Sequence, residues 1–346
     1  MKHRWVRWLP AVAVPAAIAA GAIVAPLAAG AADLPEKTPA EVLKLVAGSD
    51  TRAFSGTVEQ TSDLGLPSIP KTSGSSADSS AASTLELLMG DHTAKVYVDG
   101  PEKVRVQLLD QLAERDAIRN GSDIWLYDST GEKATHVTLP AHDSTSARRD
   151  ATATTPSALA QRFLAAVDPS TSVTLGSNTN VAGRDAYDLV LTPKTSATLV
   201  GSVSIAVDGA TGIPLRVQVV ARGASDPAFQ AGFTSFSDQA PAASVFSFTP
   251  PKGATVTEQS PKSGEHRDVG ADRKPVVTGE GWATIVSLPA GSAPAALTAD
   301  PLVARLTQPV DGGRALSTSL VSVLVTADGR VLAGSVPISA LQSAAR

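Results

Sequence analysis

The sequence predicts an α+β fold, in which a curled antiparallel sheet forms an open half-barrel with helices over its concave face, followed by a small C-terminal α+β unit. Three observations support this expectation. Short segments of alternating apolar and polar residues recur about every ten residues. Turn pairs such as Asp99-Gly100 and Asn120-Gly121 separate them, as between antiparallel strands. Two amphipathic helical segments accompany the strands.

The first helical segment begins with Thr38-Pro39-Ala40-Glu41. Thr38 can act as the N-cap, proline is favoured at the first helical position, and Glu41 completes a capping box. The second segment is 156–168, where apolar side chains recur at helical spacing. Both helices are short and amphipathic, so we expect them to pack on the sheet.

Strands are expected across 92–139 and again from 171 to about 249. In the first stretch, for example, Ala94, Val96 and Val98 occupy alternate positions, a period typical of a strand with one buried face. Because strand twist accumulates, an antiparallel sheet of this length curls toward a barrel.

The first 32 residues predict export across a membrane. Three basic residues precede an uncharged apolar run that begins at Trp8 and ends in small residues. This order is typical of a signal peptide at 1–32, cleaved after Ala31 or Ala32. An uncleaved membrane anchor is the alternative, because about 20 apolar residues can span a bilayer. Both interpretations place the rest of the chain outside the cytoplasm, either secreted or associated with the cell envelope.

Composition excludes several kinds of site. The chain has no cysteine, and therefore no disulfide, thiolate metal site, thiol nucleophile or lipid-bearing N-terminal cysteine. Removal of the signal peptide changes the net charge from −4 to −7, which gives no attraction to nucleic acid. Aromatic residues make up 4 % of the chain, too few for the stacking platforms on which sugar- and base-binding proteins rely.

Motifs for catalysis or cofactor binding are absent from the sequence, including the nucleophile elbow, the zinc-protease helix motif and phosphate-binding glycine loops. The Asp91-His92 pair is expected to be a solvated surface pair and not a metal site. Glu114-Arg115-Asp116 is expected on an exposed sheet face, with a polar rim or partner contact as the alternative. We therefore expect no enzyme activity, no metal and no cofactor.

A charged, Pro/Gly-rich stretch after residue 250 predicts a linker, which we place at 257–275. It separates a half-barrel domain at 33–256 from a small C-terminal α+β domain at 276–346, in which Pro337 is expected to begin the final helix. The Ser-rich stretch 68–83 predicts a loop.

Alternating apolar residues supply a candidate ligand-binding surface on the concave face. A hollow lined by small aliphatic side chains favours a long apolar guest over a polar substrate. The same alternation also fits a plain hydrophobic core, and periodicity alone does not separate the two interpretations. The candidate lining residues are Phe54, Val58, Val96, Val98, Val104, Val106, Leu108, Leu189, Leu191, Val203, Ile205, Val217 and Val219.

Several segments resemble the superfamily of LolA lipoprotein carriers and RseB/MucB sigma-E regulators. Four follow in order: FSGTVEQ (54–60), VAGRDAYDLVLTPK (181–194), VDGATGIPLRVQV (207–219) and FSFTPPKGATV (246–256). In the C-terminal unit, GWATIVSLP (281–289) and VLAGSVPISALQSAA (331–345) resemble the small second domain of RseB-type regulators. The resemblance implies a secreted half-barrel whose concave face, covered by helices, receives lipid acyl chains.

The resemblance also implies the partners. The first interpretation is a non-catalytic binding protein that holds a lipid acyl chain or a lipoprotein. The alternative is an RseB-like regulator that binds a membrane anti-sigma factor and senses envelope lipids, and a membrane transporter component is a further implied partner. A cell-envelope scaffold, with its hollow filled by its own side chains, is a third interpretation.

Overall fold

The fold is described from a computed structural model for residues 34–66, 91–109, 114–139, 169–259, 275–292 and 306–346. The expected signal peptide, Ser-rich loop and helix at 156–168 lie outside these ranges. Within them, every helix is too short or too polar to span a bilayer.

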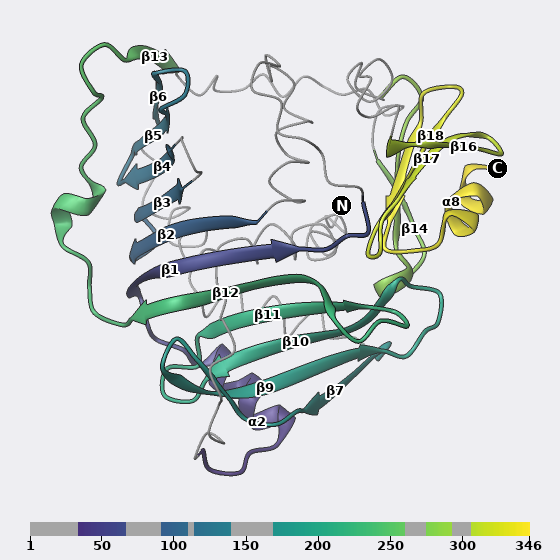
Figure 1. Ribbon diagram of the computed structural model, residues 1–346, viewed down its shortest axis with the longest axis horizontal. Coiled ribbons are helices and arrows are strands. Elements are labelled where there is room, and N and C mark those ends of the chain that lie inside the picture. Colours follow the sequence, from purple (N-terminus) through teal and green to yellow (C-terminus); the bar gives the residue numbers. More distant parts are fainter. Residues whose placement is uncertain (1–33, 67–90, 110–113, 140–168, 260–274, 293–305) are drawn as a thin grey trace, which may run out of the picture.

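Most of the described chain belongs to one large sheet. Its strands are β1 (Ala53–Ser62), β2 (His92–Asp99), β3 (Lys103–Leu109), β4 (Glu114–Asn120), β5 (Asp123–Asp128), β6 (Lys133–Thr138), β7 (Thr171–Leu175), β8 (Thr179–Val181), β9 (Arg184–Pro193), β10 (Val200–Asp208), β11 (Pro214–Ala221), β12 (Pro227–Ser237) and β13 (Thr255–Gln259). The order is β13-β6-β5-β4-β3-β2-β1-β12-β11-β10-β9-β7, with β8 beside β9. Figure 1 shows the sheet as an open curl from β13 to β7. The predicted α+β half-barrel is confirmed.

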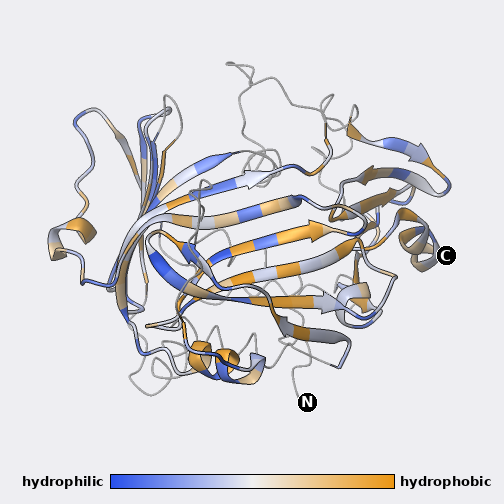
Figure 2. Ribbon diagram, turned by 60° about the horizontal axis from the view of Figure 1, so that its bottom comes forward, coloured by the Kyte–Doolittle hydropathy of each residue, from blue (hydrophilic) through white to orange (hydrophobic). Residues whose placement is uncertain are grey.

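The alternation expected along the strands follows from their pairing. Val58 lies opposite Ala94 and Phe54 opposite Val98 in the β1–β2 pair, and paired residues share a face. Figure 2 shows hydrophobic and hydrophilic residues alternating along the long strands. Where β1 meets β12, the register shifts between Thr57 and Val58. Such a bulge bends the strand and increases its twist, which contributes to the curl.

The helix α2 (Pro39–Ala47) begins with the predicted capping box. Thr38 Oγ1 accepts a hydrogen bond from the Glu41 backbone N–H, and the Thr38 backbone N–H donates to Glu41 Oε2 at 2.7 Å. On its apolar side, Val42 and Val46 are buried. Figure 1 shows this helix beside β9 and β7, so one end of the sheet is covered by a described helix.

A strap, residues 238–254, connects β12 to β13 around the outside of the curl (Figure 1). It contains the 3-10 helix η3 (Ala243–Phe246), where a strand was expected. Prolines on both sides of this segment explain the difference, because proline cannot donate to a strand ladder. The strap leads to β13, which pairs in parallel with β6. This strand occupies the start of the predicted linker.

The second sheet is small. Its strands are β14 (Val276–Thr278), β15 (Ile285–Leu288), β16 (Gln308–Val310), β17 (Gly313–Ser317), β18 (Ser322–Thr326) and β19 (Val331–Gly334). Their order in the sheet is β14-β15-β19-β18-β17-β16. The 3-10 helix η5 (Gly281–Ala283) precedes β15, and the helix α8 (Ile338–Ala345) packs on β18 and β19. Pro337 is the N-cap of α8, one residue from its predicted role.

The small sheet is docked on the large one. Trp282 Nε1 donates to Thr171 Oγ1 at 2.8 Å, and the Leu199 backbone N–H donates to the Ser335 carbonyl at 2.8 Å. The side chain of Leu320 joins the hydrophobic cluster of the large sheet. The domain bounds 33–256, 257–275 and 276–346 stay predictions, since docking does not show where an independent folding unit ends.

Candidate ligand-binding face

The thirteen predicted lining residues share one face of the large sheet. Val58 and Gln60 point to the same side of β1, since they are two residues apart. Gln60 lies opposite Ala231 on β12, and Ala231 lies opposite Val217 on β11. Equivalent pairings extend this face to β10 and β9 in one direction and to β2 and β3 in the other. The strand pairing thus places these residues on one face of the sheet, and their role in ligand binding stays a prediction.

This shared face is the inner, concave one. On β3, Arg105 lies between Val104 and Val106 in sequence and therefore points to the opposite side. Its Nη1 donates to the Val245 carbonyl of η3 at 3.2 Å. Figure 1 shows η3 on the outside of the curl, so Val104, Val106 and the other predicted residues face inward.

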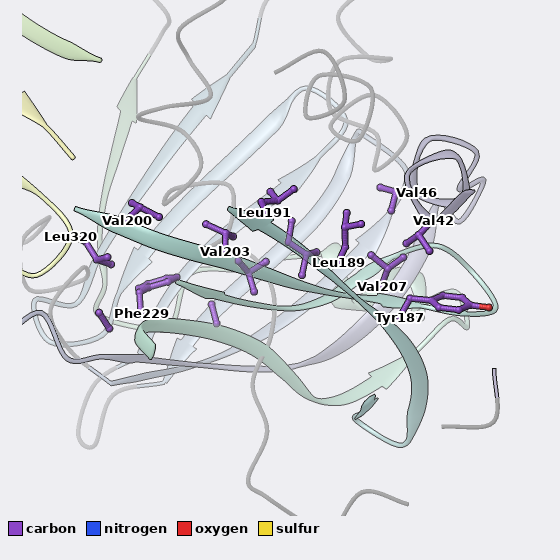
Figure 3. Packing of buried hydrophobic residues seen from close by; sticks show 14 of the residues in the cluster. Val42, Val46, Tyr187, Leu189, Leu191, Val200, Val203, Val207, Phe229 and Leu320 are labelled. Atoms are coloured by element: carbon purple, nitrogen blue, oxygen red, sulfur yellow. The ribbon is translucent and has the colours of Figure 1, made fainter. Parts of the chain in front are cut away.

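The part of the inner face on β9–β12 is filled by the protein's own side chains. Leu189, Leu191 and Val203 are 1, 3 and 4 % exposed. Val42 and Val46 of α2 belong to the same cluster and lie above these strands in Figure 3. The predicted residues on these strands therefore lie in a packed hydrophobic core.

The part of the inner face on β2–β6 is more open, and we call it the open half. Val98, Val104, Val106 and Leu108 are each only half-buried. Leu126 on β5 is 48 % exposed. It shares the inner face because the pairing runs from Val106 through Ala117 to Leu126. An apolar surface thus continues beyond the predicted residues.

Phe54, Val58 and Val96 lie between the two halves. Val58 and Val96 are both 2 % exposed. The Phe54 ring stacks on Phe236 at 5.9 Å and meets Phe233 edge-on at 6.1 Å between ring centroids. This aromatic group closes the packed core where the open half begins.

Sequence reasoning missed four apolar inner-face residues of β4–β6: Ala117, Ile124, Leu126 and Val137. The segment 122–128 was recognised as a strand, but both of its faces are apolar or aromatic, with Leu126 on one and Trp125 on the other. The pattern of apolar and polar residues in this strand therefore did not indicate which face points inward. The register with β4 and β6, a long-range property, decides it.

The Glu114-Arg115-Asp116 cluster is divided between the two faces. Asp116 points outward, but its side chain is only 2 % exposed and accepts a hydrogen bond from Arg105 Nη2 at 2.6 Å. Burial raises the pKa of Asp116, although the Arg105 hydrogen bond acts in the opposite direction. The expected exposed sheet face is wrong for Asp116, because η3 and Arg105 cover it.

Cations lie at both ends of the open half: Arg115 and Lys133 share the inner face with Leu108 through Asp128, and Arg119 lies at the opposite end. Arg119 on β4 pairs with Val104 and Ile124 on the inner face. Its Nε donates to the Gly121 carbonyl at 3.1 Å, which holds the guanidinium near the β4–β5 turn. The open half therefore combines an apolar surface with charged side chains at its two ends.

Two pockets lie away from the inner face. One, of about 310 Å³, is on the small sheet beside Asp311 and Arg330. The other, of about 300 Å³, is lined in part by Leu34 and Asp185. None of the thirteen predicted residues lines either pocket. In the ranges that the structure describes, no group of three or more histidine, aspartate or glutamate side chains is arranged so that it could hold a metal ion.

Comparison with known proteins gives matches to solved structures alone. No protein-family model matches the chain, and no curated protein matches it. MucB in its complex with MucA from Pseudomonas aeruginosa is 16 % identical, over 89 % of this chain and 96 % of the matched chain, with a TM-score of 0.45.

Two further structures have lower scores. An uncharacterized conserved protein from Thermus thermophilus is 12 % identical over 64 % of this chain and 98 % of its own, with a TM-score of 0.35. A LolA superfamily protein from Nitrosomonas europaea is 11 % identical over 62 % and 99 %, with a TM-score of 0.24. MucB and the LolA superfamily are the groups that the sequence segments resemble.

Proposed function

We propose that this protein is an exported, non-catalytic binding protein that holds a lipid acyl chain, free or attached to a lipoprotein, on the open half of the inner face. The observation that carries the proposal is the exposure of Leu126. Its side chain continues the apolar surface of Val106 and Leu108 on the inner face of the sheet. A large apolar side chain exposed inside a curl indicates a binding surface more strongly than one exposed on a convex surface.

The energetics favour a long hydrocarbon guest. Each methylene group removed from water contributes about 0.8 kcal/mol, so an acyl chain gains affinity along its length without any polar contact. The middle of this inner face is aliphatic, with Val106, Ala117 and Leu126 in one row across β3–β5. A polar substrate would leave its hydrogen-bonding groups unsatisfied against these residues.

Uptake of a fluorescent fatty acid tests this proposal, together with native mass spectrometry of gently purified protein. We expect bound lipid in the native spectrum and saturable uptake in solution. Leu126→Asp should weaken uptake at least tenfold, on the order of the cost of placing a charge against an acyl chain. Lys95→Asp, on the opposite face of β2, is the matched control and should bind normally. A protein that has only its own mass and takes up no fatty acid contradicts the proposal.

The regulator interpretation has one observation in its favour, the small sheet docked beside the curl through Trp282 and Leu320. A protein with two joined sheets offers a partner a composite surface. If it binds the extracytoplasmic segment of an anti-sigma factor, Val276→Asp on the edge strand β14 should weaken capture, because Val276 is 59 % exposed. Unchanged capture by this variant and by Leu126→Asp would remove support for a partner at either sheet.

A further inference from the structure

His136 on β6 is held between carboxylates from two other strands. Its Nε2 lies 2.9 Å from Asp123 Oδ1 on β5, and its Nδ1 lies 2.8 Å from Glu258 Oε2 on β13. The ring stacks on Trp125, with 4.2 Å between ring centroids and 11° between planes. Asp123 and Glu258 are the charged groups that act on His136. The imidazole therefore joins three strands at the edge of the large sheet.

The strand β13 has a weak hold on this edge. All five of its residues are exposed, so burial of side chains contributes little to its position. It pairs in parallel with β6, from Thr255 opposite Lys133 to Gln259 opposite Val137, and parallel pairing is slightly less stable per residue than antiparallel pairing. Phe246 and Phe248 anchor the segment that precedes β13, and the Glu258–His136 contact is a side-chain attachment within β13 itself.

This contact depends on the protonation of His136. A protonated imidazole has two N–H donors, whereas the neutral ring has one donor and one lone pair. With both carboxylates ionised, loss of the proton replaces one of the two hydrogen bonds by repulsion between a lone pair and a carboxylate. The hydrogen bond with Asp123, and then that with Glu258, accordingly raise the pKa of His136 against the opposing effect of burial.

We propose that His136 is a pH-responsive clasp that holds β13 over the edge of β6. Protonated His136 bridges Asp123 and Glu258. On deprotonation Glu258 separates first, because its side chain is 68 % exposed against 49 % for Asp123 and it belongs to the edge strand. The edge of β6 then presents unpaired backbone groups.

The direction of the pH dependence follows from the folded-state pKa. Because this pKa lies above the ordinary histidine value of about 6.5, the clasp contributes fully below that value. Its contribution is lost as the pH rises through the raised folded value. β13 is therefore held in mildly acidic surroundings and loosened in alkaline ones.

An NMR titration of the His136 ring tests the first step. We expect a pKa above the ordinary value, lowered by Asp123→Asn and by Glu258→Gln. Because Glu258 is exposed, its amide variant leaves the rest of the fold intact. A pKa at or below the ordinary value, or one that neither substitution changes, overturns the clasp.

Hydrogen exchange tests the second step in the full chain. The backbone amides of 255–259 are compared with those of the opposite edge strand β7, after correction for the intrinsic pH dependence of exchange. Protection of β13 relative to β7 should fall about two- to fivefold as His136 deprotonates, the size expected for an exposed ion pair. In Glu258→Gln this pH dependence should disappear. Constant relative protection in the wild type, or an unchanged dependence in the variant, refutes the proposal.

Discussion

Arg184 Nη2 lies 2.6 Å from Asp208 Oδ2, and Arg184 Nε lies 3.0 Å from Asp208 Oδ1, so the two side chains pair through two parallel hydrogen bonds. The Asp208 side chain is 2 % exposed and the Arg184 side chain 23 %. The backbone N–H and Oγ1 of Thr211 also donate to Asp208. This pair therefore ties the start of β9 to the turn that follows β10.

Arg184→Met should lower the free energy of unfolding by about 2–4 kcal/mol, because it leaves the buried Asp208 carboxylate without its cation. Denaturant unfolding measures the effect. The matched control is Asp238→Asn, which removes the more exposed partner of Arg184, 3.2 Å from its Nη1. That change should cost less than about 1 kcal/mol. Equal losses of unfolding free energy in the two variants would show that the Arg184–Asp208 pair contributes no more to stability than the exposed Arg184–Asp238 pair.

Asp208 should also make stability depend on acidity. Burial alone would raise the pKa of Asp208, but hydrogen bonds from Arg184 and Thr211 outweigh burial and lower it. Its contribution is therefore present above the ordinary aspartate pKa of about 3.9 and is lost as the pH falls through the lower folded value. The free energy of unfolding, measured at a series of pH values between about 5 and about 2, should decrease less steeply for Asp208→Asn than for the wild type. If the free energy of unfolding depends on pH in the same way in both proteins, Asp208 does not contribute to the acid sensitivity.

Gly56 allows β1 to approach β12 closely. A Cβ at this position would lie 2.2 Å from the Ser235 carbonyl oxygen and 2.5 Å from Phe233 Cδ1. Gly56→Ala should therefore destabilise the protein by about 1–3 kcal/mol through overpacking, measured by thermal or denaturant unfolding. Gly131→Ala is the control, since its Cβ would meet only the flexible Lys133 side chain at 3.4 Å. A neutral Gly56→Ala would mean that the two strands separate easily.

The filled and open parts of the inner face should respond differently to truncation. Leu191→Ala should cost about 2–5 kcal/mol of stability, because Leu191 is 3 % exposed among packed neighbours. Leu126→Ala should change stability by less than about 0.5 kcal/mol but should weaken fatty-acid uptake. Unfolding and binding measurements on both variants separate a core role from a ligand role. A large stability loss in Leu126→Ala would assign that residue to the core.

Local features of the fold were predictable from the sequence. The Thr38–Glu41 capping box depends on four consecutive residues, and the structure contains it as predicted. The sharing of one face by Val58, Val96 and Val106 follows from the two-residue period of a strand. Both predictions need only short-range chemistry.

Long-range features were not predictable. Pairing of β13 with β6 joins residues about 120 positions apart, and the charged, Pro/Gly-rich surroundings of Thr255–Gln259 suggested a linker. The burial of Asp116 depends on Arg105 and η3, which come from other parts of the chain. The division of the inner face into a filled and an open half likewise depends on where α2 packs, which the strand pattern does not contain.

Leu320 should couple the stability of the two sheets. It lies between β17 and β18 of the small sheet, yet it is 8 % exposed and belongs to the cluster of the large sheet, beside Phe229 in Figure 3. Leu320→Ala removes this contact and should cost about 2–3 kcal/mol, with the calorimetric transition broadening or dividing in two as the sheets begin to unfold separately. Val321→Ala, the exposed neighbour at 38 %, should leave the transition unchanged. If the two variants behave alike, Leu320 does not hold the sheets together, and the packing and hydrogen bond of Trp282 and the hydrogen bond to the Ser335 carbonyl do.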